Sequence, residues 1–120
     1  MNLKALVRQW FHAWDHNDYS NIPVSEDFRH TSPYGTIEGR GPYLQLVEAN
    51  NEKFLGNRID IKDEIYQDHH ACVRYTIVNK DFTMEVSEWF YLGEGSIREI
   101  VAYYNIEGEI KEERKLSHPS

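Results

Sequence analysis

The second half of the chain constrains the fold most strongly, because from Gly56 onwards the sequence has the pattern of strands. Apolar and polar residues alternate there with a period of two, which is typical of strands that are wet on one face. The expected strands lie at residues 59–65, 71–77, 82–92 and 97–106, and the last two are joined by a glycine-containing hairpin turn at residues 92–96. This order predicts an antiparallel meander of about four strands.

The first segment of the chain has the spacing of an amphipathic helix instead. Its apolar residues recur every three or four positions, which places them on one stripe of a helix. The stripe consists of Leu3, Leu6, Val7, Trp10, Phe11 and Trp14. We expect this helix to stop in the polar run at residues 15–18.

The middle of the chain predicts a turn and a short helical piece at residues 19–27, a brief strand at residues 28–32 and a turn at residues 32–35. A second helix is expected to begin at residues 39–42, where a proline is tolerated in the first turn, and to stop near Gly56. Helices followed by strands favour an α+β domain, with the helices covering one face of a bent sheet. We expect a single domain over residues 1–106 and a charged C-terminal tail over residues 107–120.

The composition excludes several classes of function. The chain of 120 residues has 13 basic and 20 acidic side chains, a formal net charge of −7, which argues against a nucleic-acid partner. It contains no apolar run of the roughly 20 residues needed to span a bilayer, so we expect no membrane partner. The single cysteine, Cys72, and the lack of a signal-peptide pattern predict a cytoplasmic protein.

Three stretches resemble a known superfamily. They are Leu6-Val7-Arg8-Gln9-Trp10, the segment 28–41 with its Ser-Pro-Tyr-Gly and Gly-Arg-Gly sequences, and the closing hairpin. Together they resemble the nuclear transport factor two-like superfamily, and within it the SnoaL-like polyketide cyclases and the ketosteroid isomerases. The resemblance covers residues 1 to about 106. It implies a cone-shaped barrel, made of a strongly curved antiparallel sheet covered by N-terminal helices, with a pocket for a small apolar molecule.

The resemblance to ketosteroid isomerases does not extend to their functional residues. The position of their catalytic base corresponds to Ser32, and that of their phenolic donor on the first helix to Trp10. Their acidic donor lies two residues before an aromatic residue on the penultimate strand, which we matched to Ser87 before Trp89. Serine is not a base of useful pKa, so we do not expect steroid isomerisation by that mechanism.

His30 is the candidate catalytic residue. It lies two residues before Ser32 and therefore shares its face of the strand, and an imidazole can accept and donate protons near neutral pH. The alternative is a histidine that only holds a polar cavity wall in place. By the same parity we expect Ser87, Trp89 and Tyr91 to point inwards, together with Ile100, Ala102 and Tyr104.

The candidate ligand-binding residues are the helix tryptophans and the side chains expected on the inner face. They are Trp10, Trp14, Ser32, Tyr34, Tyr75, Ser87, Trp89, Tyr91 and Tyr104. The tyrosine hydroxyls could donate hydrogen bonds to a ligand carbonyl, although the alternative is that these rings only pack.

We expect neither a cofactor nor a metal site. His69 and His70 are adjacent and point to opposite sides of the chain, so they cannot grip one ion. The other face of the sheet, expected to carry Val86, Glu88, Phe90, Val101 and Tyr103, predicts a homodimer through the sheet.

Two functions remain open from the sequence. One is a cofactor-free cyclase, isomerase or dehydratase that acts on a small apolar carbonyl compound by proton transfer. The other is a ligand-binding or structural dimeric module that has the same fold without catalysis.

Overall fold

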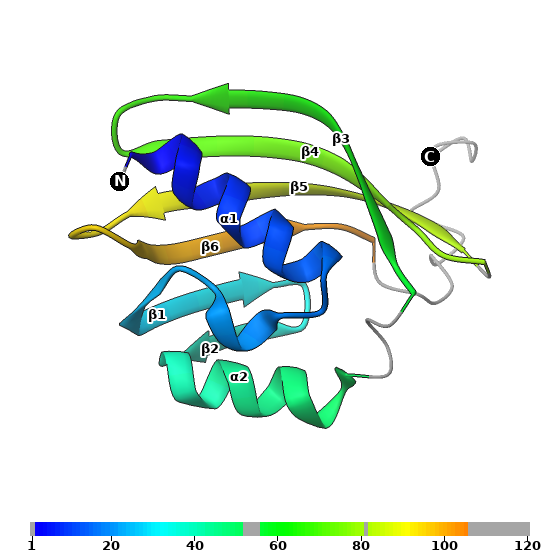
Figure 1. Cartoon of the computed structure of the whole chain (residues 1–120), viewed down its shortest axis with the longest axis horizontal. Coiled ribbons are helices and arrows are strands. Elements are labelled where there is room, and N and C mark those ends of the chain that lie inside the picture. The colour runs from blue at the N-terminus through cyan, green and yellow to red at the C-terminus, as the bar shows by residue number, and fades with distance from the viewer. Residues whose placement is uncertain (1, 52–55, 81, 106–120) are drawn as a thin grey trace, which may run out of the picture.

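The computed structural model describes residues 2–51, 56–80 and 82–105, and it has the α+β architecture that the sequence predicts (Figure 1). The elements are α1 (Leu3–Asp15), a 3₁₀ turn (Tyr19–Asn21), β1 (Val24–Ser32), β2 (Gly35–Glu38), α2 (Arg40–Ala49), β3 (Arg58–Tyr66), β4 (His70–Val78), β5 (Thr83–Leu92) and β6 (Ile97–Tyr103). The expected tail at residues 107–120 lies outside the described residues.

All strands belong to one six-stranded sheet with the order β2-β1-β6-β5-β4-β3. The last four strands form the expected antiparallel meander, whereas β1 pairs with β6 in parallel, so the sheet is mixed. The sheet is open and strongly curved, and α1 lies across its concave face (Figure 1).

Three elements differ from the sequence-based expectation. The first strand begins at Val24 rather than at residue 28, and the segment Gly35–Glu38 forms a strand that was not predicted. Four residues give too short an alternation to be recognised, and β2 exists because it pairs with β1 across the turn. Helix α2 ends at Ala49 and not near Gly56, and the Asn50 side chain donates a hydrogen bond to the Leu46 carbonyl at this end.

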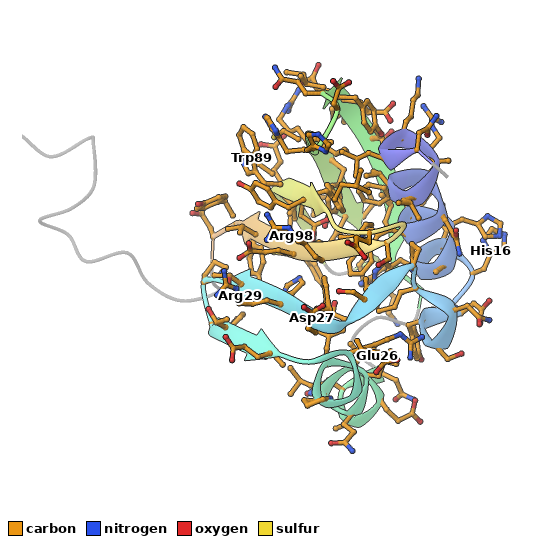
Figure 2. All side chains as sticks on the ribbon, turned by 90° about the vertical axis from the view of Figure 1, so that its left-hand side faces the viewer. His16, Glu26, Asp27, Arg29, Trp89 and Arg98 are labelled. Atoms are coloured by element: carbon orange, nitrogen blue, oxygen red, sulfur yellow. The ribbon has the colours of Figure 1, made fainter. Side chains whose placement is uncertain are left out.

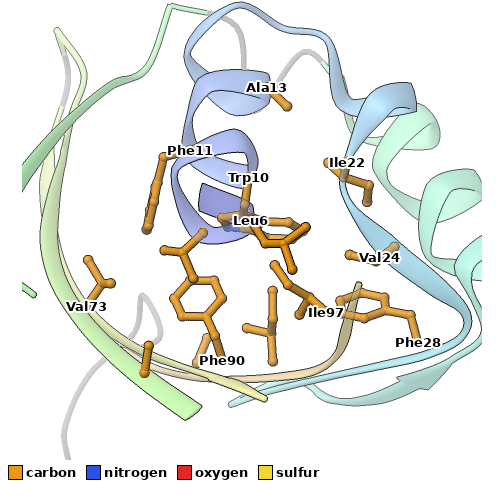
Figure 3. Close-up of a cluster of buried hydrophobic side chains, with 14 of the residues drawn as sticks. Leu6, Trp10, Phe11, Ala13, Ile22, Val24, Phe28, Val73, Phe90 and Ile97 are labelled. Carbon is orange, nitrogen blue, oxygen red and sulfur yellow. The ribbon is translucent and has the colours of Figure 1, made fainter. Parts of the chain in front are cut away.

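The concave face of the sheet carries the core, which packs against the apolar stripe of α1 (Figure 3). The largest fully buried side chains are Phe28, Phe90, Ile97, Ile100, Val7 and Val73. At the start of α1, the Asn2 side chain accepts a hydrogen bond from the Ala5 amide, which satisfies one of the free N–H groups of the first turn. The helix is therefore fixed both by a cap and by its buried face.

The expected parity of β5 is wrong. Glu88 pairs with Ala102 and Phe90 with Ile100, and all four side chains are buried on the concave face. Ser87, Trp89 and Tyr91 consequently point to the convex face, and Figure 2 shows Trp89 on the side of the sheet away from α1. The error has a clear cause, because aromatic residues lie on both faces of this strand and the alternation alone does not identify the buried one.

Candidate functional site

A cavity of about 590 Å³ opens between β1, β2, α2 and the end of β6. It is lined by His30, Ser32, Tyr34, Gly35, Thr36, Ile37, Tyr43, Leu46, Val47, Asn50 and Tyr104. Four of the sequence-predicted site residues, His30, Ser32, Tyr34 and Tyr104, are therefore brought together. Tyr43, on α2, is not among the predicted site residues, although its spacing from Val47 places it on the apolar side of this helix, where both are buried.

The other predicted residues do not line this cavity. Trp10, Trp14 and Tyr75 line a separate small cleft of about 80 Å³ between α1 and strands β3 and β4. Trp10 is buried in the core, with its ring centroid 6.3 Å from those of both Tyr43 and Phe90. The expectation that the two tryptophans form a roof over the main cavity is thus wrong, because Trp10 fills the space beneath α1.

The cavity wall contains a close pair of titratable side chains. His30 Nε2 lies 4.0 Å from Glu88 Oε2, and 14% of the His30 side chain and 5% of the Glu88 side chain are exposed. The register of the sheet explains the proximity: His30 is in a row with Ile100 and Phe90, and Glu88 lies in the next row on the same face. His30 reaches the cavity, and Glu88 lies behind it.

Burial shifts the pKa values of these two groups in opposite directions. It lowers the pKa of His30 from 6.5 to about 4, because a charged imidazolium is poorly solvated there. It raises the pKa of Glu88 from 4.5 to about 7, although hydrogen bonds from Tyr75 and Trp10 act in the opposite sense. Near neutral pH the imidazole is therefore neutral, and the carboxyl group is close to its own midpoint.

One oxygen of the carboxyl group, Glu88 Oε1, is buried and makes no hydrogen bond to any of the described residues. An unpaired buried acceptor is costly, so groups of this kind call for an explanation such as a catalytic role or a bound water. Glu88 lies on the concave face, whereas the alternation along β5 predicts it on the opposite face.

Residues with hydroxyl groups share the cavity wall with the imidazole. The Tyr43 ring packs on that of His30, with their centroids 4.9 Å apart. Burial raises the pKa of Tyr43, and the nearby Glu88 raises it further, so its phenol stays protonated. Burial also raises the pKa of Tyr104, whose hydroxyl is hydrogen-bonded to Ser32. These phenols remain hydrogen-bond donors at neutral pH.

The entrance of the cavity is aromatic. Tyr34 is 72% exposed, and its ring centroid lies 6.2 Å from that of Tyr104. The Tyr34 amide donates to the Ser32 hydroxyl, which fixes the turn that carries this ring. No Asp, Glu, Lys or Arg is among the described residues that line the cavity. The arrangement suits an uncharged ligand with a polar group directed at His30.

Arg40 braces the loop before the start of α2. Its guanidinium donates to the Ser20 carbonyl at 2.8 Å, which ties the start of α2 to the 3₁₀ turn. Within the part of the chain that the structure describes, no three His, Cys, Asp or Glu side chains are grouped so that they could hold a metal ion. No helix among the described residues is long and apolar enough to cross a membrane.

Comparison with known proteins establishes the family. The family model described as the SnoaL-like domain matches residues 7–100. The chain belongs to the SnoaL-like domain family. No curated protein matches the sequence.

Solved structures share the fold of this SnoaL-like protein at low sequence identity. An NTF2-like protein of unknown function from Cytophaga hutchinsonii superposes with a TM-score of 0.71 at 20% identity, covering 85% of this chain and 88% of that one. A candidate ketosteroid isomerase from Kribbella flavida gives 0.73 at 18% identity, with 97% and 89% covered. A candidate polyketide cyclase from Xanthomonas campestris gives 0.69 at 17% identity, with 85% and 89% covered.

Proposed function

We propose that this SnoaL-like protein is a cofactor-free enzyme that moves a proton on a small, uncharged carbonyl compound, with His30 and Glu88 acting together. The observation that carries the proposal is the contact between the cavity-lining imidazole and the buried carboxyl group, whose nearest atoms are 4.0 Å apart. The candidate isomerase and the candidate cyclase among the similar structures support the same reaction class.

The roles of the two residues follow from their positions. Because Nε2 of His30 faces Glu88, Nδ1 is the ring nitrogen left for a ligand in the cavity. When Glu88 is ionised and the 4.0 Å separation closes to hydrogen-bond distance, Nε2–H can donate to the carboxylate, and Nδ1 can accept a proton from the carbon next to the ligand carbonyl. Glu88, whose pKa of about 7 is matched to neutral pH, takes up the Nε2 proton as Nδ1 receives the substrate proton, so that no positive charge remains on the buried imidazole. The carboxyl group thereby compensates for the weak basicity of His30.

The phenols supply the complementary half of the reaction. An enolate oxygen needs a hydrogen-bond donor that is itself uncharged, and both Tyr43 and Tyr104 line the cavity as protonated phenols. Proton removal next to a carbonyl is the step that cyclisation, isomerisation and dehydration have in common. The shape of the cavity selects among these reactions.

The corrected parity of β5 strengthens the likeness to the isomerases. Their acidic donor lies two residues before an aromatic residue on the penultimate strand, and Glu88 before Phe90 meets this description on the buried face of β5. Ser32 and Trp10 still replace the base and the phenol of those enzymes. The proposed mechanism therefore uses a different base, His30.

The test is hydrogen exchange on a panel of small ketones in D₂O, followed by NMR. The wild-type chain is expected to accelerate exchange at the carbon next to the carbonyl for at least one compound that also raises its melting temperature. His30→Gln should lower that rate by about 10²–10⁴-fold, which is the usual contribution of a general base. His69→Gln, at an exposed imidazole, is the matched control and should retain the rate.

A second function is supported by one observation. A base with a pKa of about 4 is weak, so a chain in which Glu88 did not assist His30 would bind ligands without turning them over. Such a non-catalytic ligand-binding module would show the rise in melting temperature without any accelerated exchange. A rise in melting temperature without accelerated exchange, found at every pH across the titration of His30 and Glu88, would refute the enzyme proposal. The ligand-binding module would then remain.

We also propose that two copies associate through the convex face of the sheet. The register aligns Ile65, Cys72, Trp89 and Val101 in one row across four strands, and Ile65 and Trp89 are exposed. Tyr103, in the next row, is 60% exposed. This stripe replaces the set predicted from the sequence, of which only Val101 and Tyr103 lie on the convex face. Both flanking rows carry a basic and an acidic residue, and a two-fold contact can set each of them against its opposite on the second copy.

A further inference from the structure

Two histidines lie one turn apart at the C-terminal end of α1, away from the cavity: His12 is in the helix, and His16 is its C-cap residue. His12 and His16 are separated by four residues, and their ring centroids are 4.0 Å apart with an angle of 27° between the planes. Both side chains are exposed, and Figure 2 shows His16 projecting from the end of α1 on the side away from the sheet. Residues four apart on a helix are neighbours on one face, so their side chains can reach a common ligand.

Hydrogen bonding fixes the state of one ring. His16 Nδ1 lies 2.9 Å from the His12 carbonyl oxygen, and the His16 amide donates to the same oxygen at 3.1 Å. Because a carbonyl can only accept, Nδ1 must carry the hydrogen, and in the neutral ring Nε2 keeps the lone pair. A histidine that donates its other N–H to a backbone carbonyl is the usual arrangement of a metal ligand.

The surroundings favour a cation. The site is at the C-terminal end of α1, where the helix dipole is negative. Asp15 and Asp18 flank it in the sequence, and the whole chain has a net charge of −7. The exposed His12 ring can rotate out of the stack towards Nε2 of His16, while His16 keeps its hydrogen bond to the His12 carbonyl.

We propose that His12 and His16 chelate one divalent transition-metal ion of the class that prefers imidazole nitrogen, namely Zn²⁺, Ni²⁺ or Cu²⁺. Water completes the coordination, because among the described residues no third His, Cys, Asp or Glu is grouped with the pair. The bound ion bridges the last turn of α1, the helix whose buried face covers the core. It therefore stabilises the folded chain, to which it binds in preference to the unfolded one.

The experiment is calorimetric titration of the untagged, metal-free full chain with NiCl₂, together with electron paramagnetic resonance of the Cu²⁺ complex. We expect one ion per chain and a nitrogen hyperfine pattern from two imidazoles. His12→Gln and His16→Gln should each weaken binding at least about tenfold, since each removes one of two ligands. The double variant should bind more weakly than either single variant, because a single variant keeps one imidazole contact and the double variant keeps none.

His69→Gln is the matched control, since it removes an exposed imidazole outside the pair and should leave binding unchanged. Circular dichroism of each variant checks that α1 is retained. A stoichiometry of two ions per chain, with each single substitution removing one of them, would indicate two independent single-histidine contacts and overturn the proposal. Unchanged binding in both single variants, or a loss caused by His69→Gln, would place the ion elsewhere and overturn it as well.

Discussion

The opposed pKa values of His30 and Glu88 make a quantitative prediction about stability and pH. Burial raises the pKa of Glu88 from 4.5 to about 7, so between these pH values the folded chain holds a proton that the unfolded chain has lost. Stability from this group is complete below pH 4.5 and is lost as the pH rises to about 7. Burial lowers the pKa of His30 from 6.5 to about 4, so stability from this group is complete above pH 6.5 and is lost as the pH falls to about 4.

The size of each effect follows from the width of its pH window. One proton difference between the folded and unfolded states is worth about 1.4 kcal/mol for each pH unit, so each window corresponds to about 3 kcal/mol of unfolding free energy. The two contributions have opposite slopes between pH 4.5 and 6.5, where they offset one another. Replacing either residue should therefore uncover the slope of the other.

Urea unfolding over this pH range, followed by circular dichroism, tests the prediction. Relative to the wild-type chain, Glu88→Gln should gain about 3 kcal/mol of unfolding free energy as the pH rises from 4.5 to 7, since it cannot acquire a buried charge. His30→Gln should instead lose about 3 kcal/mol, relative to the wild-type chain, as the pH rises from 4 to 6.5.

Matched controls separate burial from a loss of charge in general. Glu85→Gln removes an exposed carboxylate that pairs with Arg74, and His69→Gln removes an exposed imidazole. For each control variant, the difference in unfolding free energy from the wild-type chain should stay nearly constant across this pH range. Any change should be a small fraction of the roughly 3 kcal/mol predicted above. A pH-independent difference between Glu88→Gln and the wild-type chain would refute the reasoning, because it would mean that Glu88 titrates alike in the folded and unfolded states.

Two further predictions concern the start of α2 and the convex face. Gly39 has a φ of 100°, and an added Cβ would lie 3.0 Å from Pro42 Cδ. Gly39→Ala should therefore lower the free energy of unfolding in urea by about 1–3 kcal/mol. Gly41→Ala is the control and should leave it unchanged, because an added Cβ there meets open space. Equal stabilities of these two variants would contradict the strain argument. Trp89→Arg should convert the proposed dimer into a monomer, as measured by light scattering, and should leave the ligand-induced shifts in melting temperature unaltered. A wild-type chain that is already monomeric at micromolar concentration would disprove the dimer.

Local patterns in the sequence were sufficient for most of the secondary structure. The stripe of apolar residues predicts α1 over nearly its full length, because burial of one helix face imposes a spacing that is visible in any window of the chain. Alternation predicts the four strands of the meander for the same reason. The short strand Gly35–Glu38 escapes this reasoning, since its partner, β1, and not its own four residues, makes it a strand.

In the candidate site, too, local sequence patterns predict some residues and tertiary contacts decide the others. The chain itself identifies His30 as a residue suited to proton transfer, and its two-residue spacing from Ser32 correctly places both in one cavity wall. Glu88 could not be assigned from β5 alone, because alternation defines two faces without saying which one is buried. That choice depends on the pairing of Glu88 with Ala102 and on the position of α1, both contacts between segments distant in the sequence. Only the folded sheet therefore brings the carboxyl group behind the imidazole, and only burial there gives the two groups the pKa values on which the proposed chemistry depends.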